Sequence, residues 1–225
     1  MNTRTLKSRK ILIADNSDNQ EVTKLFIQGK TLMQQGHADA AVPLLEKCTE
    51  LDPTFLSGLT QLGIALQQVG RTKDCLAAFK KVVELEPNRA SYWSNLANAY
   101  LVDKNFEEAA DAFKHAIEID PNLSQVHESY GFVLTKLNND KLAKEHLAQC
   151  VKLAPESANA WNLLGAVSVR LKDAQTAKEA YTEYLRLRPK AADAHDISAL
   201  LKKLEKDVKK QERKEAEGSA EDTAK

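Results

Sequence analysis

The chain has 225 residues, of which 43 % are hydrophobic, 28 % are charged and only eight are glycine. This composition supplies a continuous core and favours helices over sheets. The 32 basic and 32 acidic residues balance, which excludes a general attraction to nucleic acid or to a membrane surface. We therefore expect no nucleic-acid binding and no membrane insertion, and partners that are recognised through local surfaces.

Residues 1–21 form an N-terminal leader before the regular part of the chain. The leader begins with four basic residues, Arg4, Lys7, Arg9 and Lys10, and continues with a short apolar run, 11–14. This run is too short for a signal peptide or a membrane span, so we expect a cytoplasmic protein. The leader is interpreted first as disordered. The alternative is a strand or short segment that docks on the repeats or on a partner.

A second feature of the leader is the sequence KILIAD at residues 10–15. It is similar to the first strand and acidic turn of bacterial response-regulator receiver domains. Asn16 stands where those domains have a second acid, and the rest of such a domain is missing from the chain. The resemblance adds a receiver remnant to the interpretations of the leader.

Five prolines divide the following part of the chain into equal steps of 34 residues: Pro53, Pro87, Pro121, Pro155 and Pro189. Proline has no backbone N–H and disfavours the helical conformation of the residue before it, so each one is expected to end a helix. Aligning the chain on these prolines predicts five units, at residues 22–55, 56–89, 90–123, 124–157 and 158–191.

The same residue types recur inside each unit. Glycine costs about 1 kcal/mol relative to alanine inside a helix, so its recurrence at position 8 indicates close approach of two antiparallel helices. We expect the small residue at position 20 to face it and the large residue at position 24 to fill the space beside it. These three positions hold Gly29, Gly63, Ala97, Gly131 and Gly165; Ala41, Cys75, Ala109, Ala143 and Ala177; and Leu45, Phe79, Phe113, Leu147 and Tyr181.

This pattern resembles the tetratricopeptide repeat (TPR) family, whose unit has 34 residues. The third unit carries the family residues most completely, with Trp93, Leu96, Ala97, Tyr100, Ala109, Phe113, Ala116 and Pro121. The resemblance implies an all-α fold, a right-handed superhelical solenoid of five TPR helix-turn-helix units. Three residues depart from the pattern: His127 at position 4, Ser168 at position 11, and Pro43 near the start of a second helix.

After the last unit, residues 192–215 are predicted to form a capping helix. Ile197, Leu200, Leu201, Leu204 and Val208 fall on one helical stripe, and lysines surround it. Such a helix would cover the exposed side of the last unit. Residues 216–225 are expected to be a disordered tail.

No catalytic, metal-binding or cofactor-binding motif is complete. Residues 29–31 read GKT, but a phosphate-binding loop would need a glycine where Lys24 stands. The pair 127–128 begins an HExxH zinc motif that fails at Gly131. The three cysteines, Cys48, Cys75 and Cys150, have no CxxC spacing and are predicted to be reduced core residues. We therefore expect no enzyme, no metal and no cofactor.

In the TPR family, first-helix positions 2, 5, 9, 12 and 13 line a concave groove. Carried over to this chain, the resemblance implies a lining of amide, hydroxyl and apolar side chains, of which Asn98, Phe132 and Asn162 are the strongest candidates. Amides suit the backbone of an extended peptide, and apolar patches suit its side chains or one face of a helix. The candidate groove residues are Ile64, Gln67, Ser94, Asn98, Leu101, Glu128, Phe132, Lys136, Asn162, Val169 and Arg170.

The function implied is that of a non-catalytic TPR scaffold or adaptor that binds a protein or peptide ligand in this groove. A chaperone-docking TPR is disfavoured, because Ser91 and Asn95 stand where its carboxylate clamp has Lys and Arg. Two alternatives stay open. The first is a regulatory component of a bacterial signalling system that acts through the leader. The second is an uncharted enzyme or nucleic-acid binder, although the latter would need a basic stripe that the groove lacks.

Overall fold

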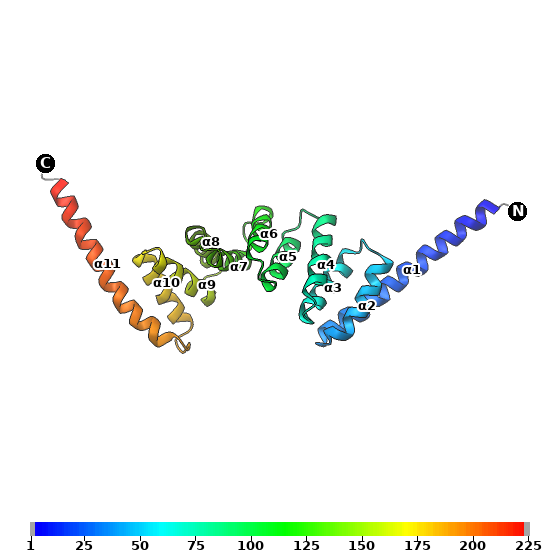
Figure 1. The fold of residues 1–225 in the computed structure, drawn as a ribbon, viewed down its shortest axis with the longest axis horizontal. Helices are drawn as coiled ribbons and strands as arrows, with labels where there is room; N and C mark the ends of the chain where they lie inside the picture. Colours follow the sequence, from blue (N-terminus) through cyan, green and yellow to red (C-terminus); the bar gives the residue numbers. More distant parts are fainter. Residues whose placement is uncertain (1–2, 223–225) are drawn as a thin grey trace. The chain divides into compact units, whose positions relative to one another are not determined.

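The computed structural model describes the backbone of residues 3–222 and the side chains of residues 19–209. Within this backbone there are eleven α-helices and no strand, which confirms the all-α class. The chain divides into two compact units, Met1–Ile119 and Asp120–Lys225. Figure 1 shows the helices of each unit, labelled and coloured in chain order.

The first unit contains three helical hairpins, in which each helix packs against the next. Short turns connect the helices, because glycine or another residue with positive φ stops the first helix of each pair. The helices are α1 (Thr3–Gln34), α2 (Ala38–Leu51), α3 (Leu56–Gln68), α4 (Thr72–Leu85), α5 (Ala90–Val102) and α6 (Phe106–Ile119).

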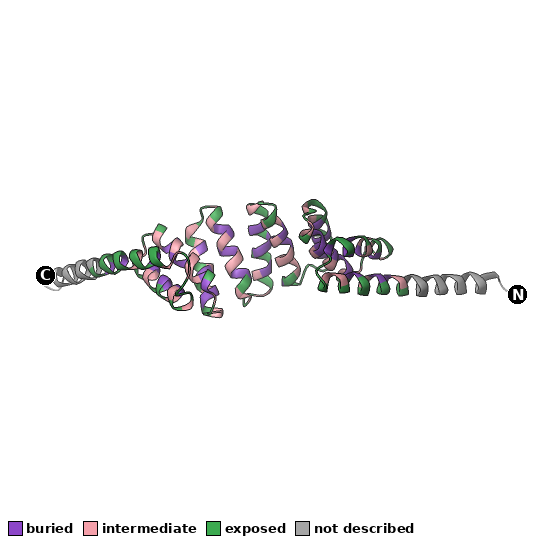
Figure 2. Cartoon of the chain, turned by 90° about the horizontal axis from the view of Figure 1, so that it is seen from below, coloured by how far each residue is buried: buried purple, intermediate pink, exposed green. Residues whose placement is uncertain are grey.

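The second unit contains two hairpins and a long C-terminal helix that packs against the last of them. Figure 2 shows buried residues on the helix surfaces that face one another and exposed residues on the outer surfaces. The helices are α7 (Ser124–Lys136), α8 (Asp140–Leu153), α9 (Ala158–Arg170), α10 (Ala174–Leu187) and α11 (Ala194–Asp222).

Every first helix of a hairpin ends in the same way. The residue at position 15 takes a positive φ, and the next backbone N–H donates to a carbonyl five residues back, as His37 does to Leu32 (2.9 Å). This is the Schellman arrangement, which satisfies carbonyls that the helix end leaves open. The left-handed residues are Gly36 (80°), Gly70 (76°), Lys104 (61°), Asn138 (57°) and Lys172 (59°).

The recurring glycine at position 8 lies under the large side chain at position 24. A Cβ added to Gly63 would come within 2.7 Å of the Phe79 ring, and one added to Gly131 would come within 2.6 Å of Leu147. The close approach that we expected is therefore made by position 24, whereas the small residue at position 20 is not among the nearest neighbours. In the third hairpin, Ala97 shows that the packing also accommodates a methyl group, since it is fully buried.

A ring at position 4 links each of three hairpins to the proline six residues before it. The ring N–H donates to the proline carbonyl and so satisfies a group that the turn leaves open. The bonds are Trp93 Nε1 to Pro87 O (2.7 Å), Trp161 Nε1 to Pro155 O (2.9 Å) and His127 Nε2 to Pro121 O (2.9 Å). His127, a departure from the family pattern, thus replaces the tryptophan as a hydrogen-bond donor.

The N-terminal helix differs from the disordered leader or strand that we expected. Helix α1 begins at Thr3, so residues 3–21 are helical and continuous with the first helix of the first unit. The backbone of residues 10–15 is helical rather than a strand. Extending an existing helix avoids the cost of nucleation, and no glycine or proline interrupts residues 1–28.

The C-terminal helix α11 packs against α10 and continues to Asp222, past the expected end at residue 215. Ile197, Leu204 and Val208 from the predicted apolar stripe are buried, and Leu200 and Leu201 are half-buried. Tyr184 of α10 donates its hydroxyl to Asp193 Oδ1 (2.7 Å) just before the helix begins. The stripe therefore does cover one side of the last hairpin.

Pro43 lies further inside its helix than the sequence suggested. It is within α2, which begins at Ala38, and so lies beyond the first helical positions whose N–H groups have no partner. The proline therefore removes one intrahelical hydrogen bond. Its side chain is exposed, so the ring itself makes no steric demand on the core.

Candidate functional site

The predicted groove residues lie on first helices of the hairpins, and none of them is fully buried. Nine are half-buried, while Lys136 and Arg170 are exposed. We treat them as two surfaces, one in each unit. The α3–α5 face consists of Ile64, Gln67, Ser94, Asn98 and Leu101, and the α7–α9 face consists of Glu128, Phe132, Lys136, Asn162, Val169 and Arg170.

The α3–α5 face has polar side chains that are not used within the chain. Ser94 and Asn98 lie one turn apart on α5, and no described residue bonds their side chains. Thr60 on α3 differs, since its hydroxyl donates to Leu56 O of its own helix (2.7 Å). The half-buried amide of Asn98 therefore leaves both its donor and its acceptor groups unused among the described residues.

The α7–α9 face carries charges that are mostly engaged. Arg170 donates to both carboxylate oxygens of Asp140, from Nε (2.8 Å) and from Nη2 (2.6 Å). These bonds lower the pKa of Asp140. Glu128 Oε2 accepts from the Ser157 hydroxyl at the start of α9 (2.6 Å). Arg170 and Glu128 therefore help to join the two hairpins of this unit.

The remaining residues of this face divide into two kinds. Lys136 places its ammonium 5.0 Å from the centre of the Phe132 ring, a cation–π contact. No described residue bonds the side chain of Asn162. Val169, in contrast, packs against a hydrophobic cluster formed by residues of α9, α10 and α11.

Two histidines and a tyrosine form a cluster between α7 and α8. His127 is 4 % exposed, and its Nδ1 lies 3.0 Å from Nδ1 of His146. Because His127 Nε2–H donates to Pro121 O, its Nδ1 is unprotonated and accepts a hydrogen bond from His146 Nδ1–H. The Tyr130 ring lies 4.6 Å from the His146 ring. Burial, and then the neighbouring His127, lower the pKa of His146 to about 4.

This depressed pKa predicts a loss of stability in mild acid. Histidine in the unfolded chain has a pKa of about 6.5, whereas His146 in the folded chain has a pKa of about 4. Between these two pH values the unfolded chain therefore binds one more proton at His146 than the folded chain does. Stability should therefore fall as the pH drops from about 6.5 towards 4. We expect the melting temperature of the wild type to fall between pH 7 and pH 5 by a few degrees more than that of His146→Gln. Equal falls would contradict this assignment.

The cysteines and the described surface add no reactive site. Burial raises the pKa of the Cys75 and Cys150 thiols to about 11, which keeps them protonated.

Ser168 is fully buried, and its hydroxyl has no hydrogen-bond partner. Among residues with described side chains, no three metal-ligating groups gather. Over the same residues, no helix has the length and apolar character needed to cross a bilayer.

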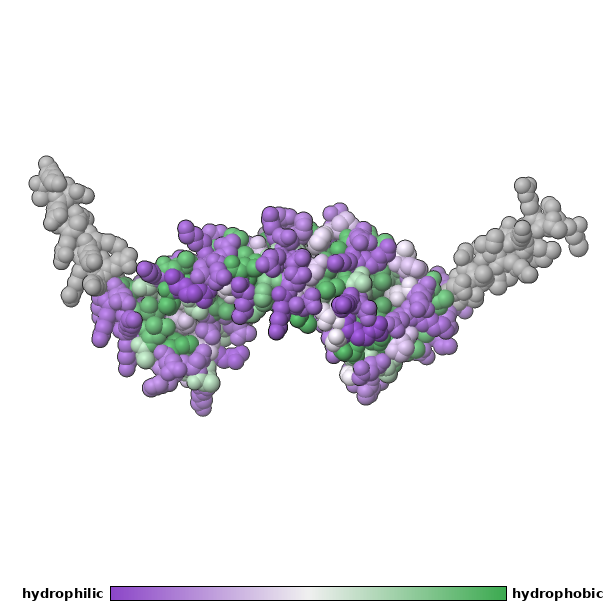
Figure 3. All heavy atoms as spheres, viewed as in Figure 1, coloured by the Kyte–Doolittle hydropathy of each residue, from purple (hydrophilic) through white to green (hydrophobic). Residues whose placement is uncertain are grey.

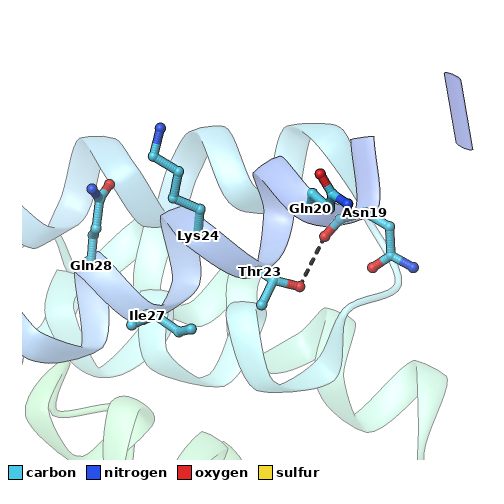
Figure 4. A pocket seen from close by; sticks show the side chains of 6 residues that line it. All are labelled: Asn19, Gln20, Thr23, Lys24, Ile27 and Gln28. Atoms are coloured by element: carbon cyan, nitrogen blue, oxygen red, sulfur yellow. Dashed lines mark hydrogen bonds between the residues drawn. The ribbon is translucent and has the colours of Figure 1, made fainter. Parts of the chain in front are cut away.

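One surface feature was missed by the sequence reasoning, a shallow depression of about 460 Å³ along α1. Its six lining side chains all come from this helix, and Figure 4 shows Thr23 bonded to the carbonyl of Asn19 (2.9 Å). Ile27 is 57 % exposed there. The signal in the sequence was an isoleucine at position 6, which is not one of the positions expected to contact a ligand.

Figure 3 shows hydrophilic side chains over much of the surface and hydrophobic ones gathered in patches on the viewed face of each unit. Such patches are typical of surfaces that bind other molecules.

Two family descriptions match the chain: "Cytochrome c-type biogenesis protein H TPR domain" at residues 73–195 and "Tetratricopeptide repeat" at residues 32–99. No curated protein matches it. Among solved structures, MamA from Desulfovibrio magneticus RS-1 aligns with a TM-score of 0.70 at 21 % identity, over 76 % of this chain and 97 % of that one.

Two further solved structures share the fold. YrrB, described as a TPR protein with an unusual peptide-binding site, has a TM-score of 0.69 at 16 % identity, over 85 % of this chain and 97 % of that one. The pilF protein of Pseudomonas aeruginosa has a TM-score of 0.71 at 18 % identity, over 86 % of this chain and 88 % of that one. Proteins built from this repeat generally mediate protein–protein interactions and are typically not catalytic. The chain belongs to the tetratricopeptide repeat family.

Proposed function

We propose that this protein is a non-catalytic scaffold or adaptor that binds a protein or peptide segment through its first-helix surfaces. The observation that carries the proposal is the pair of half-buried amides, Asn98 and Asn162, which have no partner among the described residues. Asparagine is a poor helix former, so local stability does not explain either residue. Hydrogen bonding to the backbone of a ligand accounts for the presence of both amides.

The α3–α5 face offers Asn98 and Ser94 as hydrogen-bonding groups beside the apolar side chains of Ile64 and Leu101. An amide can donate to a peptide carbonyl and accept from a peptide N–H at the same time. The neighbouring aliphatic groups can take alternate side chains of an extended segment. This combination supports a peptide ligand rather than a small metabolite.

The α7–α9 face supports the same function with a different composition. Phe132 is a half-buried aromatic residue on a helix surface, and its ring supplies a large apolar contact at low cost in conformational entropy. Asn162 supplies the amide. The relative YrrB is itself described as having a peptide-binding site.

Two further observations bear on the mode of action. The side chains concerned lie on regular helices, so binding loses little ordering entropy on the protein side. The three cysteines are free and buried, which supports a reducing compartment, and we propose the cytoplasm.

The proposal is tested with a peptide selected from a random display library against the immobilised wild type. The double variant Asn98→Ala/Phe132→Ala should bind the selected peptide about tenfold or more weakly, since it removes a contact from each face and so weakens a peptide that binds either one. Fluorescence anisotropy of the labelled peptide measures the affinity, and circular dichroism confirms that the helices persist.

The matched control is Asp111→Asn/Glu145→Gln, which changes two exposed side chains on the second helices α6 and α8. This variant should bind as the wild type does. Equal affinity of the wild type and the Asn98→Ala/Phe132→Ala variant for every selected peptide would contradict the assignment of these faces as the binding surfaces.

A further inference from the structure

A second pocket lies within the C-terminal unit, where α11 leaves the last hairpin. It has a volume of about 390 Å³ and is lined by residues from α9, from the turn and start of α10, and from α11. Its apolar walls are Val169, Ala174, Leu200 and Leu204. The volume is near the lower end of ligand-binding pockets, which begin at about 300 Å³, so it suits one or two aliphatic side chains.

The rim of the pocket has an excess of positive charge. Lys172 comes from the turn before α10, and Lys203 comes from α11. Both are exposed, and neither forms an ion pair with a described residue. One carboxylate, Asp207, also lines the pocket and lies four residues after Lys203, but no ion pair joins them.

Two further charged groups beside the pocket are already neutralised within the unit. Arg170 is held by Asp140 through two hydrogen bonds, and Asp173 accepts from Lys144 and from Thr176. Burial opposes ionisation of Asp173, but the bonds from Lys144 and Thr176 prevail and lower its pKa to about 2. Lys172 and Lys203 are therefore the cations of the pocket lining that form no ion pair within the described residues.

We propose that this pocket binds an acidic peptide segment of a partner protein, with an aliphatic side chain in the pocket and flanking carboxylates on Lys172 and Lys203. The apolar walls supply affinity for the aliphatic group, and the unpaired lysines select against basic segments. The pocket shares Val169 with the α7–α9 face, but neither Asn98 nor Phe132 lines it.

The probe is a fluorescent synthetic peptide with a central pair of leucines flanked by glutamates, added to the full-length chain. Anisotropy should show binding that weakens as salt is raised, because exposed charges are screened. The double variant Lys172→Glu/Lys203→Glu should bind about tenfold more weakly. The matched control Lys141→Glu/Lys152→Glu makes the same change of net charge on exposed lysines of α8 and should bind as the wild type does.

Two altered peptides separate the parts of the proposal. Replacing the leucines with serines should remove binding, and replacing the glutamates with lysines should also remove it. The Asn98→Ala/Phe132→Ala variant should keep the wild-type affinity for this probe, so the two proposals fail independently. Equal binding by both lysine double variants, or undiminished binding of the serine peptide, would overturn the pocket assignment.

Discussion

Replacing Gly63 with valine is expected to lower the free energy of unfolding by about 3 kcal/mol, the upper end of over-packing effects. A Cβ at this position would lie 2.7 Å from Cε1 and Cζ of Phe79. Phe79 is 1 % exposed, so its ring cannot move without displacing other core side chains. Urea unfolding followed by circular dichroism measures the change.

The reason for this cost is tested in a Phe79→Ala background. Truncating the ring removes the atoms that a side chain at position 63 would meet, so the same valine should then cost less than about 1 kcal/mol. A similar cost in both backgrounds would show that the Phe79 ring is not what requires glycine at position 63.

The second large effect is expected from Phe113→Ala, which should cost about 3–5 kcal/mol. Phe113 is fully buried in α6, and Ala97 of α5 is fully buried with it. Alanine would leave a cavity between the two helices of the third hairpin, and the helices cannot close it completely. The same urea experiment measures the loss.

Phe113→Leu is the matched comparison, because the fourth hairpin has Leu147 at the equivalent position. Leucine keeps most of the apolar volume and should cost roughly 1.5 kcal/mol or less. If alanine and leucine cost the same, the third hairpin would have to collapse around the smaller residue.

The hairpins could be predicted from the sequence because their signals are local and repeated. Each proline ends a helix for a reason that lies within a few residues of it. The stripe from Ile197 to Val208 likewise predicted a packed C-terminal helix, because burial follows from helical spacing alone. Both inferences need only the near neighbours of each residue.

Contacts between hairpins could not be predicted in the same way. Arg170 was predicted as a groove residue from its position in the repeat, but its ion pair with Asp140, which is 30 residues away in the sequence, was not predicted. Likewise, Lys172 and Lys203 line the same pocket only because α11 packs against the last hairpin. Such partners are determined by the packing of whole helices. The spacing of residues within one 34-residue repeat does not reveal them.

The leader shows a limit of a different kind. An aliphatic run of four residues, 11–14, fits a short strand as well as one turn of a helix. The helix α1 that continues through it is decided by the residues that follow, because a helix propagates more easily than it begins.

The bonds from the rings of Trp93, His127 and Trp161 to the prolines constrain how this chain can change in length. Each bond joins residues six apart, so inserting or deleting a single residue between proline and ring would break it. The chain can gain or lose whole 34-residue units without disturbing any of these closures. Growth by duplication of complete units, rather than by small insertions at these junctions, is therefore the change in length that the architecture permits.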